Sequence, residues 1–156
     1  MIDRVARNHL AVRLRHLASG LMSNDRFEDS SRRSQDRAIA ELEWRLAWPV
    51  YDDMHEHRLT GDYALTYGQR RDFARAILFL KTELEYEWAT KRGLRGFINS
   101  TFRLRPLRRN PPVSTQGGDL RVWPFYRRED YAAALKTRPY LHGQADTLWR
   151  TNRFQK

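Results

Sequence analysis

The chain contains no cysteine among its 156 residues. That absence excludes a disulfide framework, a thiolate nucleophile and a zinc site built from cysteine ligands. The sequence also lacks any apolar run near the roughly 20 residues that cross a bilayer. Its first ten residues, MIDRVARNHL, carry charges where a signal peptide has an apolar segment. We therefore expect a cytoplasmic protein with no membrane contact.

The motifs that identify many enzymes are missing as well. There is no Gly-rich phosphate loop followed by Lys and Ser or Thr, no dinucleotide fingerprint and no nucleophile elbow. No short segment combines a nucleophile, a base and an electrophile. We therefore predict no cofactor, and a non-catalytic protein in preference to an enzyme.

What the chain has in excess is positive charge, and this charge is unevenly spread. The 29 basic and 19 acidic residues leave a net charge of +10. Residues 1–37 carry eight basic and five acidic side chains, residues 38–90 carry six and ten, and residues 91–156 carry fifteen and four. An acidic middle therefore precedes a strongly basic C-terminal third. Either the two parts neutralise each other within the fold, or the basic third contacts an anionic partner.

The N-terminal two-thirds of the chain has the apolar spacing of helices. Hydrophobic residues make up 40% of the chain, which suits a globular protein with one sizeable core. The spacing predicts helices over residues 2–18, from about 34 to 51, and from Thr66 or Gly68 to Leu84. The positions that we expect in the core are Ile39, Leu42, Leu46, Phe73, Ile77 and Leu80.

The second predicted helix also carries an aromatic row. Trp44, Trp48 and Tyr51 lie at spacing i, i+4, i+7, opposite the aliphatic stripe of the same helix. We expect these rings in the core, because a domain of this size needs its large residues inside. The alternative is an exposed row that docks a partner. Pro49 should kink or end the helix.

A short segment lies between the first two predicted helices. Its sequence is LASGLMSNDRFED, residues 17–29, and Ser23 or Asn24 can cap a short helical turn there. The segment resembles the helix–turn–helix of SHOCT-like bacterial modules, in which a Gly and a small polar residue precede an acidic–Phe pair. The Lys-rich helix that follows in that family is absent here. The resemblance implies no catalytic residue.

The composition changes after residue 90. Residues 91–118, KRGLRGFINSTFRLRPLRRNPPVSTQGG, contain seven basic residues and no acidic one. We predict strands over residues 97–104 and 119–126, a loop over 105–118, and a helix from about Glu129 to before Pro139. The expected fold is therefore α+β and mainly α, as one domain over residues 1–156. Residues 1–90 form its helical core, and residues 91–156 form a basic β–loop–β–α addition.

The favoured binding site is the part of this region that holds its cations, residues 91–109, which we call the basic segment. Two aromatic residues, Phe97 and Phe102, lie among its cations, a combination typical of phosphate neutralisation with base stacking. No helix-turn-helix, zinc-finger, RNP or KH motif accompanies it. We predict an interaction module that binds an anionic macromolecule, either an acidic protein or, as the alternative, nucleic acid. The predicted contact residues are Arg92, Arg95, Arg103, Arg105, Arg108 and Arg109.

One other segment, YDDMHEHRLTGDY at residues 51–63, has the residue types of a metal site. Asp53 and His57 would share one face of a helix, whereas His55 would point away from them. Zinc sites need three or four ligands, so another carboxylate, such as Asp62 or Glu83, would have to complete the set. A small metal-dependent enzyme using Asp53 and His57 is therefore the less favoured hypothesis. The favoured interpretation is a solvated helix end before a turn.

Overall fold

The computed structural model describes residues 1–52, 54–88 and 117–137. These residues form helices and loops. The α-helices are α1 (Arg4–Ala18), α2 (Asn24–Asp29), α3 (Arg37–Leu42), α4 (Tyr67–Leu80) and α6 (Arg128–Thr137). The chain leaves α3 through a π-helix, η1 (Glu43–Ala47), and a 3-10 helix, η2 (Trp48–Val50); two more 3-10 turns are η3 (Gly61–Tyr63) and η4 (Leu120–Val122).

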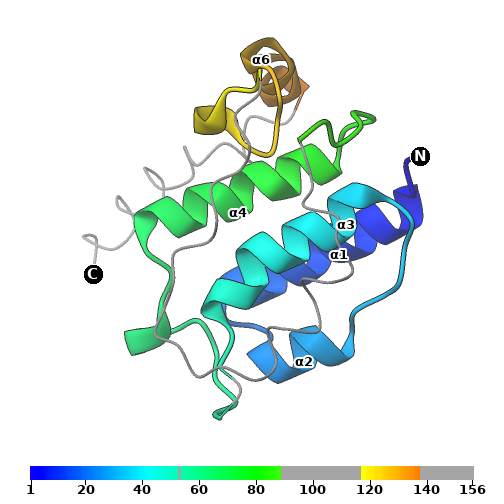
Figure 1. The fold of residues 1–156 in the computed structure, drawn as a ribbon. Coiled ribbons are helices and arrows are strands. Elements are labelled where there is room, and N and C mark those ends of the chain that lie inside the picture. The colour runs from blue at the N-terminus through cyan, green and yellow to red at the C-terminus, as the bar shows by residue number, and fades with distance from the viewer. Residues whose placement is uncertain (53, 89–116, 138–156) are drawn as a thin grey trace.

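The helix α4 is central to the described fold. It packs against α1 on one side and against α6 on the other, while α3 lies beside α1 and α2 contacts the same helix (Figure 1). The six residues that the sequence placed in the core are all buried, and Leu42 and Leu80 are fully inaccessible. None of the helices in the described ranges has both the length and the apolar character that crossing a membrane requires.

The first helix confirms the predicted boundaries closely. Asp3 is its N-cap and accepts a hydrogen bond of 2.9 Å from the amide of Ala6. Leu10, Leu14 and Leu17 form the buried stripe. The helix ends before Gly20, whose φ of 71° is the left-handed conformation that glycine adopts without strain.

The second predicted helix changes its geometry before it ends. Its N-cap is Asp36, two residues after the predicted start near residue 34, and the α-helical part gives way to η1 and η2. Pro49 supplies a physical reason for the change. It has no amide hydrogen for the carbonyl of Arg45, and its ring would crowd that carbonyl in a regular α-helix. The chain has left the helix at Tyr51, where the backbone is extended.

The third predicted helix begins as expected and ends four residues early. Thr66 and Gln69 form a capping box, in which the amide of Thr66 donates to the Gln69 side chain at 2.8 Å. The helix stops at Leu80 instead of Leu84. At this end of the helix, the guanidinium of Arg4 donates to the carbonyls of Leu80 and Thr82, at 2.7 and 2.5 Å. These tertiary bonds satisfy carbonyls that lack partners at a helix end.

The α+β prediction is wrong for the described residues, which contain no β-strand. The predicted strand over residues 119–126 is a set of tight turns. The side chain of Asp119 caps η4 by accepting from the amide of Arg121 at 3.0 Å, and the amide of Phe125 donates to the carbonyl of Val122 at 3.0 Å. Local bonds thus replace strand pairing. The predicted strand over residues 97–104 lies outside the described residues, whereas the final helix is confirmed as α6.

An aromatic cluster joins the turn region to α4. Phe79 meets the edge of Phe125 with ring centroids 5.3 Å apart, and both rings are buried. The indole N–H of Trp123 donates to the hydroxyl of Tyr86 at 3.2 Å. The indole N–H of Trp123 and the hydroxyl of Tyr86 can be buried because each has the other as its hydrogen-bonding partner. Residues 117–126 therefore share a core with the N-terminal helices.

Candidate functional site

The six predicted contact arginines, Arg92, Arg95, Arg103, Arg105, Arg108 and Arg109, lie outside the described residues. The charge balance of the described residues nevertheless shows in which part of the chain the net positive charge lies. The described residues hold 18 basic and 17 acidic side chains, a net of +1. Residues 89–116 hold seven basic and none acidic, and residues 138–156 hold four and one. Nearly all of the net charge therefore belongs to residues 89–116 and 138–156, whereas the described residues are close to neutral.

The glutamates closest in sequence to the basic segment already have partners. Glu83 lies 2.6 Å from Arg4, and Glu85 lies 3.0 Å from the amino group of Met1. Glu87 binds both terminal nitrogens of Arg127, at 3.2 and 3.0 Å. The acidic run of residues 83–87 is thus engaged by the N-terminal residues and by one arginine from beyond the basic segment.

Asp119, which follows the basic segment in the sequence, forms ion pairs with two arginines. Its carboxylate accepts from the side chain of Arg121 at 3.0 Å and from Arg128 at 3.1 Å. The hydrogen bond from the Arg121 side chain, helped by the Arg121 amide, lowers the pKa of Asp119 to about 2. Asp119 is therefore ionised over the whole physiological pH range and is paired with Arg121 and Arg128.

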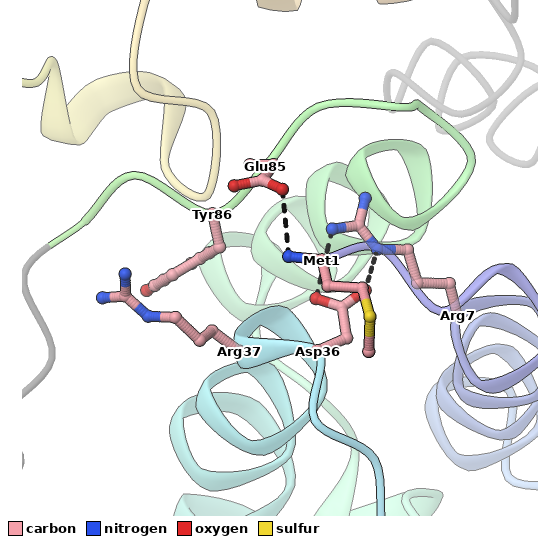
Figure 2. A pocket seen from close by; sticks show the side chains of 6 residues that line it. All are labelled: Met1, Arg7, Asp36, Arg37, Glu85 and Tyr86. Carbon is pink, nitrogen blue, oxygen red and sulfur yellow. Dashed lines mark hydrogen bonds and ion pairs between the residues drawn. The ribbon is translucent and has the colours of Figure 1, made fainter.

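A buried ion pair that sequence reasoning missed lies beside a small polar hollow. Arg7 is fully buried and binds Asp36 through two nitrogens, at 2.5 and 3.2 Å, and it donates to the carbonyls of Thr82 and Leu84. Figure 2 shows the pair with the Met1–Glu85 contact close by. Sequence offered a weak signal only: an arginine at a position that the helical spacing places beside Leu10 and Leu14.

The hollow has little room for chemistry. Its volume is about 30 Å³, enough for about one water molecule. The lining residues are Met1, Arg7, Asp36, Arg37, Glu85 and Tyr86. Burial raises the pKa of Tyr86, so its hydroxyl stays protonated and serves as a hydrogen-bonding group. The arrangement holds three segments of the chain together, because Arg7 binds Asp36 and the amino group of Met1 binds Glu85.

The segment with the residue types of a metal site is a loop, so the helical spacing assumed for Asp53 and His57 does not apply. The buried side chain of Asn24 organises this loop. Its amide nitrogen donates to the carbonyls of Asp52 and His55, at 3.0 and 3.1 Å, and its oxygen accepts from the amide of His57 at 2.7 Å. Sequence reasoning saw Asn24 only as a possible helix cap.

The ring of His57 is turned into the loop. Its Nδ1 and Nε2 each lie 3.1 Å from a carbonyl oxygen, of His55 and Val50 respectively, and its face stacks on Tyr63. Neither ring nitrogen therefore points to an open coordination position. Among the residues described, no three His, Asp or Glu side chains converge as metal ligands would. Asp53 lies outside the described residues.

The aromatic row of the second predicted helix is not in the core, contrary to our expectation. Trp44 is 43% exposed and Trp48 is 49% exposed. The rings stack on each other, with centroids 5.0 Å apart between the tryptophans and 5.7 Å between Trp48 and Tyr51. The core is filled instead by the aliphatic stripe and by the aromatic cluster on α4.

Compared with models of known protein families, with curated proteins and with solved structures, the chain matches none of them. The short resemblance of residues 17–29 to SHOCT-like modules therefore gains no support from these comparisons.

Proposed function

We propose that this protein is a non-catalytic interaction module that binds an anionic macromolecule through its basic segment, residues 91–109. The observation that carries the proposal is the separation of charge. The described body has a net charge of +1, whereas residues 89–116 contain seven basic side chains and no acidic one. Such a concentration of one sign attracts polyanions and speeds their association.

The competing interpretation was neutralisation of this segment by the acidic middle of the chain. The pairing of the acidic side chains argues against it. Glu83, Glu85 and Glu87 are engaged by other cations. Further along, Glu43 pairs with Arg13 at 2.5 Å, and Glu41 pairs with Arg45 at 3.2 Å. An external polyanion is the simpler counterpart for the basic segment.

Binding of this kind has a measurable signature. A cation that neutralises a phosphate releases condensed counterions, so affinity for nucleic acid falls steeply as salt rises. The slope of log affinity against log salt is about −0.7 to −0.9 per phosphate contacted. Phe97 and Phe102 lie between the arginines in sequence and could stack on bases if the partner is single-stranded.

The test measures binding of the whole chain to single-stranded DNA, double-stranded DNA and poly-L-glutamate at several salt concentrations. Replacing Arg103, Arg105, Arg108 and Arg109 by Gln should weaken binding and flatten the salt slope. The control variant replaces Arg15, Arg26, Arg32 and Arg33 by Gln. These four arginines are exposed on the described body, and their loss changes the net charge equally. We expect the control to keep most of the affinity.

The three probes separate the two kinds of partner. Binding to DNA that depends on the four segment arginines supports a nucleic-acid partner, and binding only to poly-L-glutamate supports an acidic protein. No binding to any probe at low salt contradicts the proposal. Equal losses in the segment variant and the control would show that total charge, rather than this segment, makes the contact.

A further inference from the structure

His57 lies in the loop between η2 and η3, and its backbone is fixed to α2 through both its amide and its carbonyl. The amide of His57 donates to the side chain of Asn24 at 2.7 Å, and its carbonyl accepts from the amide of Asn24 at 3.0 Å. Asn24 is buried and is the first residue of α2. The next residue, Arg58, forms an antiparallel bridge with Ser23. The imidazole ring therefore projects from a backbone that α2 holds in place.

Both ring nitrogens of His57 face carbonyl oxygens. Nδ1 lies 3.1 Å from the carbonyl of His55, and Nε2 lies 3.1 Å from the carbonyl of Val50. A carbonyl oxygen can only accept a hydrogen bond, so each nitrogen must carry a proton for both bonds to form. A neutral imidazole has one N–H, whereas the protonated ring has two. The geometry therefore suits an imidazolium, because in a neutral ring one nitrogen lone pair would face a carbonyl oxygen.

The surroundings of the ring favour a positive charge. Its face stacks on Tyr63, with centroids 4.2 Å apart and planes inclined by 27°, and an aromatic face attracts a cation. Asp52, in the same loop, supplies a negative charge. The amide of Met54 lowers the pKa of Asp52, and the charges of His55 and His57 lower it further, whereas desolvation opposes them. Asp52 is therefore ionised at neutral pH and attracts protons to these histidines.

Other ionisable side chains of the loop have partners away from the ring. Glu56 accepts from the hydroxyl of Ser23, and Arg58 donates to the carbonyl of Gly20 at 3.4 Å. In α2, Glu28 accepts from the hydroxyl of Tyr51. Among the described residues, the remaining charged side chains of α2 and η3 form no hydrogen bond or ion pair with the ring; they are Asp25, Arg26, Asp29 and Asp62. The described groups that act on the charge of His57 are thus the two carbonyls, the Tyr63 ring and Asp52.

We propose that His57 is a pH-dependent switch that closes this loop when its ring is protonated and loosens it when the proton leaves. With two ring protons, His57 joins the carbonyls of Val50 and His55, and with one proton it keeps only one of these bonds. Val50 ends η2, so the two bonds connect the end of that helix to the loop that follows it. Histidine ordinarily titrates at about pH 6.5, so the switch operates between about pH 5 and 8. The proposal does not depend on the proposed function.

The test compares the stability of His57→Phe with that of the wild-type chain at about pH 5.5 and about pH 8.5. Phenylalanine keeps a ring that can stack on Tyr63 but has no N–H to donate. The matched control is His55→Phe, the same change in the same loop at a side chain that is 73% exposed. Urea denaturation measures the unfolding equilibrium constant, in buffers with EDTA so that no metal ion competes for the ring nitrogens.

Because the protonated ring makes one more hydrogen bond, its stabilising contribution is present at low pH and is lost as the pH rises. We expect the increase in the unfolding constant caused by His57→Phe to be about five-fold larger at about pH 5.5 than at about pH 8.5. The effect of His55→Phe should change by less than about two-fold, because exposed ion pairs contribute little. An effect of His57→Phe that is equal at the two pH values, or larger at the higher one, would overturn the proposal.

A second measurement uses the wild-type chain alone and so covers the case in which His57→Phe fails to fold. At about pH 5.5, NMR should detect one histidine ring with two N–H protons that are protected from exchange with water and lie close to the ring of Tyr63. At about pH 8.5, one of these two protons should be gone. If no histidine ring near Tyr63 shows a second protected N–H at the lower pH, the proposal fails.

Discussion

Two buried arginines are the least expected residues of this fold. Arg7 is joined to Asp36 and to two backbone carbonyls. Arg13 donates to Ser30 at 2.8 Å, to Glu43 at 2.5 Å and to the carbonyl of Phe27, and its guanidinium lies 4.1 Å from the centre of the Phe27 ring. The planar guanidinium supplies five donors, so one side chain can join several segments. Both residues face inward because partners for these donors are present inside.

We predict that Asp36→Asn destabilises the protein by about 3–5 kcal/mol at neutral pH, because it leaves the charge of Arg7 buried without a counterion. Burial alone raises the pKa of Asp36, but hydrogen bonds from Arg7 and from the amides of Asp3 and Ala38 outweigh burial and hold the pKa below its ordinary 3.8. The stabilisation is therefore complete above about pH 4 and is lost as the pH falls through the lower, folded pKa.

The measurement is the free energy of unfolding from urea denaturation, between pH 7 and pH 2.5, for the wild-type chain and the variant. Their difference should shrink below about pH 4, where Asp36 becomes protonated in the wild type too. The control is Asp62→Asn, the same change at an exposed carboxylate in η3. A difference that stays constant to pH 2.5 would show that the charge of Asp36 is not what stabilises Arg7.

At the scale of single elements, helix starts follow from local chemistry more closely than helix ends do. Asp3, Ser23 and Thr66 each cap a helix by accepting from a nearby amide, and each precedes a helix that the sequence indicates. The end of α4 depends on Arg4, which is remote in sequence. A cap is recognised within four residues, whereas a partner 76 positions away is not.

We predict that Thr66→Ala costs about 0.5–2 kcal/mol, because it removes the hydroxyl that accepts from the amide of Gln69. Thr60→Ala is the matched control. Thr60 precedes η3, but its side chain makes no capping hydrogen bond. Urea denaturation of both variants measures the difference. Similar losses in the two would mean that the capping box of α4 contributes nothing specific.

The aromatic row illustrates a limit of helical spacing. The spacing showed that Trp44, Trp48 and Tyr51 lie opposite Ile39, Leu42 and Leu46. It did not show which of the two stripes faces the core. The aliphatic stripe is buried beside α1 and α4, so the aromatic row has to point away from them. The choice is made by the neighbouring helices, because a helix with apolar residues on two sides can turn either way.

At the scale of the whole molecule, the turn region after Gly117 is part of the main core. Phe125 is fully buried between Phe79 of α4 and Tyr131 of α6. We predict that Phe125→Ala destabilises the protein by about 3–5 kcal/mol. We also predict that the urea midpoints from circular dichroism and from tryptophan fluorescence move together, because one core unfolds as one cooperative unit.

The control for this prediction is Leu120→Ala, in the same turn region but 43% exposed, which should change stability by no more than about 0.5 kcal/mol. A fluorescence midpoint that shifts while the circular dichroism midpoint stays unchanged would contradict a shared core. It would then indicate that residues 117–137 unfold separately from the N-terminal helices.

The sequence by itself determined the three main helices and most of the aliphatic core, because helical periodicity acts over a few residues. It also determined the separation of charge, which is a property of composition. Only the tertiary structure decided that residues 119–126 form turns instead of a strand, that Arg7 and Asn24 lie inside, and that the tryptophans of the second helix lie outside. It alone brought Trp88 against Gly118, where a Cβ would lie 2.6 Å from the indole ring. The burial of Arg7 and Asn24 and the packing of Trp88 depend on partners 28 or more positions away in the sequence, and a local sequence pattern does not specify which distant groups will meet.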